Sequence, residues 1–159
     1  MATEIGDTQP HRRWHPAPYD EMRRAFRWQV PRRYNIAADV LDKHEPARPA
    51  MYWEDWEGNE RTLTFGDIQA LTNRTANALR AYGVDEGDRV AVMLPPIPEA
   101  AAAFLATYKL GGVLLSLSIL YGDDSIVHRL RDCSAKVIVT DAANRERLRR
   151  TLAVDVRSL

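Results

Sequence analysis

The chain of 159 residues is long enough for one domain with a hydrophobic core. Its composition, 45% hydrophobic and 28% charged residues, is that of an ordinary globular protein. No apolar stretch approaches the ~18 residues of a membrane-spanning helix. Residues 1–10 lack the apolar segment of a secretion signal, and the single cysteine, Cys133, excludes an internal disulfide. These features predict a cytoplasmic protein without a membrane span.

The chain carries no net charge, but its two ends are basic and its middle is acidic. Residues 1–33 hold seven Arg against four acids, and residues 142–159 hold five Arg against two acids. A nucleic-acid-binding protein concentrates its basic residues on one face of the fold. Basic ends on an acidic middle therefore favour solvated surfaces and predict that nucleic acid is not a partner.

Residues 1–33 are expected to form an extended arm, because four prolines interrupt them. Within this arm, residues 21–30 predict a short helix. The aromatic side chains of the whole arm are spaced as anchors that would pack it onto a larger body. These anchors are Trp14, Tyr19, Phe26 and Trp28.

Residues 34–159 form the second predicted region, which begins with a helix and a hairpin. Asn35 is suited to cap a helix that runs through Lys43. Residues 51–56 and 61–64 predict two strands joined by a turn at Gly58 and Asn59. The expected apolar stripe of the first helix is Ile36, Val40 and Leu41.

The next predicted helix has clear start and stop signals. Thr64 and Asp67 resemble a capping box. Gly83 is suited to the left-handed residue that ends a helix. Side chains recur along one face with a helical period at Ile68, Leu71, Thr75, Leu79 and Tyr82.

Three strand–helix units follow. Residues 90–94, 113–117 and 137–140 are apolar runs typical of strands buried on both faces of a parallel sheet. Helices are expected at residues 98–110, from Asp123 or Asp124 onward, and at residues 142–152, and a fourth strand is expected to begin at Val154. The apolar face of the second of these helices is expected to be Ile126, Val127 and Leu130. The pattern predicts an α/β fold, in which a partial parallel sheet with flanking helices follows the arm and the β-hairpin.

Phosphate-binding loops are absent from the sequence. There is no GxxxxGKS/T motif, and no GxGxxG follows any predicted strand. Gly111 and Gly112 lie between a helix and a strand, where close packing of the turn explains them. No cofactor-binding residue is therefore predicted.

Metal-binding and catalytic residues are not predicted either. His11 and His15 are four residues apart, but the neighbouring prolines disfavour the helix that would bring them together. Cys133 is expected to be a small buried residue late in a helix. The adjacent acids Asp123 and Asp124 are expected to cap the helix start and to favour it electrostatically, rather than to act as a general acid and base.

Six segments, taken together, resemble the start of the adenylate-forming acyl-CoA synthetases, in the order and spacing of that family. The segment around Tyr121 and Arg129, here called the branch motif, resembles a motif of the family's acetyl- and medium-chain branch. The resemblance covers about residues 14–145. The family patterns "NIA…DRH", "tYxeL…N…A…LGV", "GDRVAI", "A..KLGAV", "lfG…yRL" and "AKALVTD" are similar to residues 34–44, 62–84, 87–92, 107–113, 121–130 and 135–141.

The resemblance implies an acid–thiol ligase. Members of the family use Mg-ATP to convert a carboxylic acid to an acyl-adenylate with release of pyrophosphate, and then transfer the acyl group to CoA, leaving AMP. ATP, Mg and CoA are the implied cofactors of such an enzyme. The family's phosphate loop, adenine- and ribose-binding residues and catalytic lysine have no match here, and Lys43, Lys109 and Lys136 lie in other motifs. The resemblance thus implies an inactive N-terminal portion that binds no cofactor by itself and has the rest of the synthetase as its partner.

Tyr121 and Arg129 are the candidate residues near the mouth for CoA and the acid, because the branch motif follows the second predicted buried strand. The alternative for Arg129 is an ion pair with an acid on a helix surface. One departure lies nearby: residues 115–118 are Leu-Ser-Leu-Ser where the family often has proline.

Three hypotheses remain open at this point. The chain is a truncated acyl-CoA synthetase, cut by a gene break, a frameshift or a cloning boundary. Alternatively, it is a non-catalytic interaction module that kept this fold, or an unrelated flavodoxin-like binder of small molecules. Under the first hypothesis, we expect an open sheet edge and exposed apolar surface.

Overall fold

The computed structural model describes residues 18–152. The chain divides into two units, and the boundary along the sequence lies between Arg33 and Tyr34. In the first unit, helix α1 (Tyr19–Ala25) has acids in its first turn and arginines in its last, as the helix dipole favours. The helix predicted at residues 21–30 is displaced, because Phe26 is already extended (φ −68°, ψ 131°) and ends it.

Aromatic side chains in this first unit are exposed. Trp28 is 83% exposed, and its ring meets that of Phe26 edge to face with 5.0 Å between the ring centroids. No residue of α1 is buried. Trp14, the first predicted anchor, lies outside the described residues.

The second unit begins with a short helical segment that Asn35 caps, as predicted. Its side-chain oxygen accepts hydrogen bonds from the N–H groups of Ala37 (3.0 Å) and Ala38 (3.3 Å). The segment continues as π-helix η1 (Ala38–Asp42) instead of the predicted α-helix through Lys43.

The buried face of this segment also differs from the predicted stripe. Ala37 and Leu41 are buried, whereas Ile36 and Val40 are exposed, at 43% and 42%. A hydrogen bond from Asn35 to the carbonyl oxygen of Tyr108 (3.0 Å) anchors the segment and fixes which face turns inward.

A hairpin and a long helix follow. Strands β1 (Pro49–Glu54) and β2 (Glu60–Thr64) pair antiparallel as predicted, although β1 begins and ends two residues early. Helix α2 (Phe65–Ala81) begins at the predicted capping box, in which Thr64 and Asp67 exchange side-chain and backbone hydrogen bonds. Its buried positions are Ile68, Thr72, Ala76 and Leu79, so the predicted Leu71 and Thr75 lie beside the buried face and Tyr82 is exposed.

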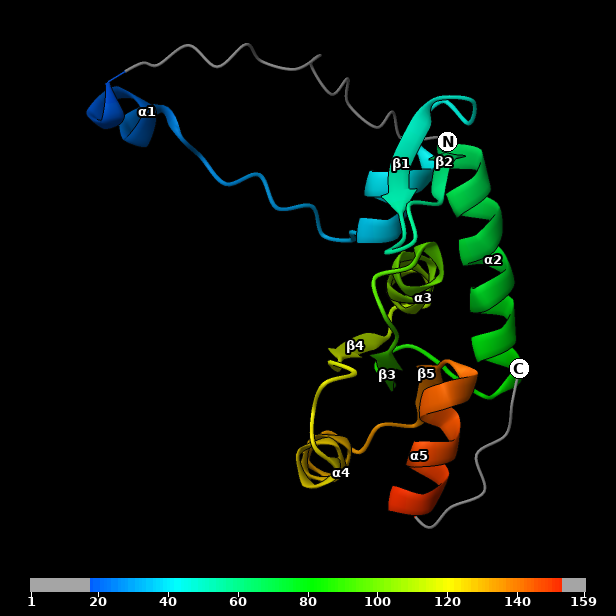
Figure 1. Cartoon of the computed structure of the whole chain (residues 1–159). Coiled ribbons are helices and arrows are strands. Elements are labelled where there is room, and N and C mark those ends of the chain that lie inside the picture. Colours follow the sequence, from blue (N-terminus) through cyan, green and yellow to red (C-terminus); the bar gives the residue numbers. More distant parts are fainter. Residues whose placement is uncertain (1–17, 153–159) are drawn as a thin grey trace. The chain divides into compact units, whose positions relative to one another are not determined.

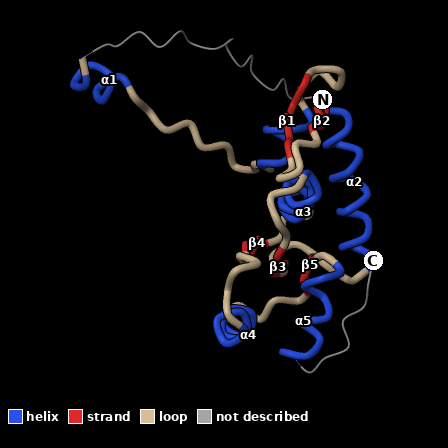
Figure 2. Tube along the Cα trace, viewed as in Figure 1, coloured by secondary structure: helices blue, strands red, loops and turns tan. Residues whose placement is uncertain are grey.

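The parallel sheet has three strands in the order β4-β3-β5. The strands are β3 (Arg89–Met93), β4 (Val113–Ser116) and β5 (Val137–Thr140). They alternate with α3 (Pro98–Lys109), α4 (Asp123–Asp132) and α5 (Ala142–Leu152). Figures 1 and 2 show α2 and α3 on one side of the sheet and α4 and α5 on the other, which confirms the predicted α/β class.

Two buried clusters correspond to these two layers. The first joins α2 and α3 to Val90 and Val92, and the second joins α4 and α5 to Ala91 and Met93. Successive residues of β3 therefore face opposite layers, as the pleat of a strand requires.

Only the central strand meets the prediction of burial on both faces. Residues Val90, Ala91, Val92 and Met93 are at most 2% exposed. Val113 of β4 is 53% exposed, and every residue of β5 is half-buried, because each of these strands is an edge of the sheet within residues 18–152. The expected fourth strand at Val154 lies outside the described residues.

The start of α4 corrects another prediction. Neither Asp123 nor Asp124 is the N-cap residue; the extended Gly122 is, and it makes no side-chain capping hydrogen bond. The carboxylate of Asp123 instead binds the guanidinium of Arg147 (2.7 Å). Cys133, predicted to be buried, is half-buried at the end of α4.

Ile126 and Leu130 are buried on α4 as predicted, while Val127 is half-buried. Within residues 18–152, no helix combines the length and the apolar character needed to cross a membrane.

Candidate functional site

A hollow of about 630 Å³ opens at the carboxyl ends of β3 and β4. In parallel sheets this edge is where ligands usually bind. Its walls come from strand β1, the loop after β3, the first turns of α3 and the loop after β4. The lining residues are Met51, Trp53, Leu94, Pro95, Pro96, Ile97, Ala100, Ala101, Phe104, Ser116, Leu117, Ser118 and Tyr121.

Local sequence explains how the β3–α3 wall is held. Pro98 occupies the first turn of α3, where its missing N–H costs nothing, and Ile97 before it is extended. The indole N–H of Trp53 donates to the carbonyl oxygen of Pro96 (2.9 Å) and so ties the hairpin to this loop. Arg61 lies over the Trp53 ring at 5.9 Å.

The two predicted site residues, Tyr121 and Arg129, contact each other. The guanidinium carbon of Arg129 lies 4.6 Å from the centre of the Tyr121 ring, a cation–π geometry. Its Nη1 donates to the hydroxyl of Ser125 (2.6 Å), one turn earlier on α4. Within the part of the chain that is described, Arg129 contacts no carboxylate, so the expected surface ion pair is not found there. Of the two residues, Tyr121 lines the hollow, and Arg129 is not among the lining residues.

Arg147 holds the loop that carries Tyr121, a role that the sequence did not indicate. It donates to the carbonyl oxygens of Ile119 (3.2 Å) and Tyr121 and binds the carboxylate of Asp123. The hydrogen bond from Arg147 lowers the pKa of Asp123 from its ordinary value. Only the basic character of α5 was visible in the sequence, because 26 positions separate Arg147 from Tyr121.

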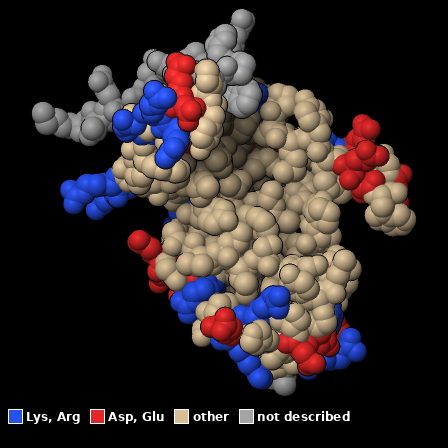
Figure 3. Space-filling model, turned by 90° about the vertical axis from the view of Figure 1, so that its left-hand side faces the viewer, with Lys and Arg blue, Asp and Glu red and all other residues tan. Residues whose placement is uncertain are grey.

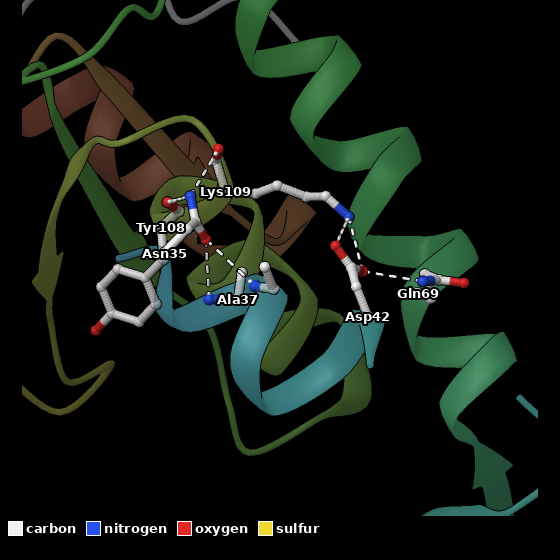
Figure 4. A network of polar contacts seen from close by, with 7 residues as sticks. Asn35, Ala37, Asp42, Gln69, Tyr108 and Lys109 are labelled. Atoms are coloured by element: carbon white, nitrogen blue, oxygen red, sulfur yellow. Dashed lines mark hydrogen bonds and ion pairs between the residues drawn. The ribbon is translucent and has the colours of Figure 1, made fainter. Parts of the chain in front are cut away.

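A second polar cluster joins three segments of the chain (Figure 4). Asp42 of η1 accepts hydrogen bonds from Lys109 of α3 (2.9 Å) and Gln69 of α2 (2.9 Å). Burial raises the pKa of Asp42, but the bonds from Lys109 and Gln69 outweigh it and leave that pKa below its ordinary value. Lys109 thus joins α3 to η1 through its ion pair with Asp42.

The chemistry of the hollow does not suit a phosphate or a metal ion. No lining residue carries a charge, and the polar side-chain groups are the hydroxyls of Ser116, Ser118 and Tyr121 and the indole N–H of Trp53, which is bonded to Pro96. The face in Figure 3 likewise has a broad central area without charged side chains. Within residues 18–152 no three His, Cys, Asp or Glu side chains gather as metal ligands, and the pair His11 and His15 lies outside that range. The lining of this hollow thus suits an apolar group.

Comparisons with known proteins identify the family. The model of the AMP-binding enzymes matches residues 38–158. The acetyl-coenzyme A synthetase of Caulobacter vibrioides is 37% identical over 119 residues, which are 72% of this chain and 18% of that protein. The 3-hydroxypropionyl-coenzyme A synthetase of Metallosphaera sedula is 34% identical over 118 residues, again 72% of this chain and 18% of that protein.

Solved structures agree with these relatives. An acyl-CoA synthetase of Brucella canis superposes with a TM-score of 0.69 at 30% identity, over 76% of this chain and 22% of that one. Apo MatB of Rhodopseudomonas palustris superposes with a TM-score of 0.64 at 31% identity, over 75% and 23%. The chain spans about a fifth of the length of these proteins. It belongs to the AMP-binding enzyme family, as an N-terminal portion related to the acetyl-CoA and other acyl-CoA synthetases.

Proposed function

We propose that this chain is the N-terminal part of an AMP-forming acyl-CoA synthetase and does not form an acyl-adenylate by itself. The observation that best supports this proposal is the hollow at the carboxyl edge of the sheet, which has apolar walls and no charged lining residue. Adenylation requires cations and N–H donors aimed at the transferring phosphate oxygens. In the proposed enzyme, the rest of the synthetase supplies these groups together with the sites for ATP, Mg and CoA.

Within that enzyme, the hollow forms one wall of the mouth that admits the acid and CoA. Tyr121 lines this wall. The cation–π contact with Arg129 holds its ring, and the hydrogen bond from Arg147 to its carbonyl oxygen holds its backbone. A residue fixed from both sides defines the width of an opening more sharply than a mobile one does. We also propose the cytoplasm as the working compartment, which a single cysteine and a CoA-dependent reaction favour.

Isotope exchange between pyrophosphate and ATP tests whether the chain by itself forms an acyl-adenylate. Purified protein, cleared of host synthetases, is incubated with Mg-ATP, labelled pyrophosphate and a panel of carboxylic acids. The expected result is exchange at the rate of a blank. Exchange above the blank with any acid would contradict the proposal.

A chimera tests the role of Tyr121 at the mouth. It is the Caulobacter vibrioides acetyl-coenzyme A synthetase in which residues 34–152 of this chain replace the corresponding segment. Tyr121→Ala in this chimera should raise kcat/KM for longer acids relative to acetate by roughly tenfold, because removal of the ring widens the mouth.

The matched control is Tyr52→Ala, since Tyr52 is a 78% exposed tyrosine outside the lining of the hollow. This control should leave the preference unchanged. The same chain-length profile in Tyr121→Ala and in the unmodified chimera would remove Tyr121 from the mouth.

A further inference from the structure

We propose that Arg147 is a specificity-determining residue of the synthetase, which sets the preference among acids of different length by positioning Tyr121. The inference rests on the proposed function, in which Tyr121 forms part of the mouth. It assigns this preference in part to α5, a helix that contributes no residue to the lining of the hollow. Arg147 is thus a positioning residue that acts on the acid through another side chain.

The guanidinium of Arg147 bonds to three acceptors at once. Its Nε donates to the carboxylate of Asp123 (2.7 Å), its Nη1 to the carbonyl oxygen of Ile119 (3.2 Å) and its Nη2 to the carbonyl oxygen of Tyr121. One side chain therefore holds the chain before, at and after Tyr121. A guanidinium is planar and presents its donors in a fixed fork, so the three bonds restrain this loop as a unit.

The two carbonyl groups depend on Arg147 for their hydrogen bonds to the rest of the fold. Within residues 18–152, no backbone N–H donates to the carbonyl oxygen of Ile119 or of Tyr121. Leu120, which lies between them, is exposed and adds little packing. Without Arg147 the two oxygens would be left to water, and the backbone that carries the Tyr121 ring would be less restrained.

Arg147 is itself attached to the core. The next residue, Leu148, is fully buried in the cluster that joins α4 and α5 to the sheet. Arg129, which contacts the ring of Tyr121, belongs to α4, the helix into which the loop leads directly. Arg147 instead ties the loop to a separate element, so it fixes the position of Tyr121 relative to the core.

The test is the ratio of kcat/KM for butyrate to kcat/KM for acetate in the chimera described above. Arg147→Gln should raise this ratio by about three- to tenfold, in the same direction as Tyr121→Ala, although it removes no atom from the hollow. Both acids are measured on one preparation, so a smaller folded fraction or a general loss of activity does not change the ratio. A merely structural role of Arg147 would therefore leave the ratio unchanged.

A double variant and a matched control separate positioning from other effects. Tyr121→Ala combined with Arg147→Gln should show the ratio of Tyr121→Ala alone, because a residue that acts through the ring has no effect once the ring is absent. Arg150→Gln removes the same charge from the same helix, and its exposed side chain contacts Glu146 (3.9 Å) instead of the loop. This control should keep the ratio of the unmodified chimera.

Asp123→Asn gives a second way to loosen the loop if Arg147→Gln leaves too little enzyme to assay. It weakens one of the three bonds of Arg147 and leaves the two carbonyl groups bonded. The ratio should rise by about twofold, which is less than the effect of Arg147→Gln.

Failure of this inference differs from failure of the proposed function. An inactive unmodified chimera overturns the proposed function and the inference with it. An active chimera in which Tyr121→Ala shifts the ratio, but neither Arg147→Gln nor Asp123→Asn does, overturns the role of Arg147 alone. Additive shifts in the double variant, or an equal shift in Arg150→Gln, would show that Arg147 does not act through Tyr121 and would also overturn it.

Discussion

The hydroxyl of Thr72 in α2 is fully buried and has no hydrogen-bond partner among the described residues. Such a group keeps its desolvation cost without compensation. Thr72→Val should therefore raise the free energy of unfolding by about 1 kcal/mol in urea titrations.

Thr107 provides the matched control, because its equally buried hydroxyl donates to the carbonyl oxygen of Ala103 (2.8 Å). Thr107→Val should leave stability unchanged or lower it. Equal responses of the two variants would show that the Thr72 hydroxyl has a partner.

Asp42 links the pH dependence of stability to the polar cluster of Figure 4. Its pKa is lower in the folded chain than in the unfolded chain, so the carboxylate stabilises the fold above its unfolded pKa, and this stabilisation is lost as pH falls through the folded pKa. Asp42→Asn should cost about 1 kcal/mol of unfolding free energy at neutral pH, and the difference from the unmodified chain should shrink below about pH 4.

Asp39→Asn is the control for this prediction. Asp39 also binds a lysine, Lys43, at 2.6 Å, but both side chains are 41% exposed. Its effect at neutral pH should be close to zero. Urea titrations of both variants at about pH 3.5, 5 and 7 make the comparison, and a constant cost of Asp42→Asn at all three values would contradict it.

Single residues show where sequence-based prediction succeeds. The capping roles of Asn35 and of Thr64 with Asp67 were predictable, because a cap acts on backbone groups two or three residues away. The ion pair of Asp42 with Lys109 joins residues 67 positions apart, and no local rule indicates it. Tyr121 and Arg129 were named as one candidate pair, but their direct contact became visible only in the fold.

At the scale of elements, the turn between α3 and β4 depends on Gly112. A Cβ at this position would lie 3.1 Å from the methyl group of Thr107 and 3.2 Å from two backbone oxygens, one of them that of Asp88. Gly112→Ala should destabilise the chain by about 1–3 kcal/mol, because backbone atoms have to move.

Gly122 is the matched control for this prediction. A Cβ added at Gly122 would have no atom within 4 Å, and the φ of this residue is −66°, so alanine fits there without strain. Gly122→Ala should be neutral within about 0.5 kcal/mol in the same thermal and urea melts. Comparable losses in both variants would contradict close packing at Gly112.

The strands and helices also show which features of the fold could not be predicted from the sequence. All three sheet strands were predicted from short, mainly apolar runs between turn residues and helices, which are local signals of a strand. Their burial was overestimated for β4 and β5, because burial depends on which strand is central, and order in a sheet is set by long-range crossovers. The contacts of η1 with α2 and α3 through Asp42 likewise join residues that are distant in the sequence.

At the scale of the whole molecule, the two half-buried edge strands and the exposed aromatic side chains predict limited stability. We expect the isolated chain to unfold with low cooperativity and to associate without a defined stoichiometry. Calorimetry and light scattering test this expectation. A sharp transition above about 60 °C from a clean monomer would favour the non-catalytic interaction module. Membership in the AMP-binding family already excludes the unrelated flavodoxin-like binder.

ATP–pyrophosphate exchange with acetate, measured on the isolated chain and on the chimera side by side, tests most directly whether this chain is the N-terminal part of a synthetase. The predicted result is a blank rate for the chain and exchange by the chimera within about tenfold of the unmodified Caulobacter vibrioides enzyme. Exchange by the chain alone, or a folded chimera without exchange, would contradict it.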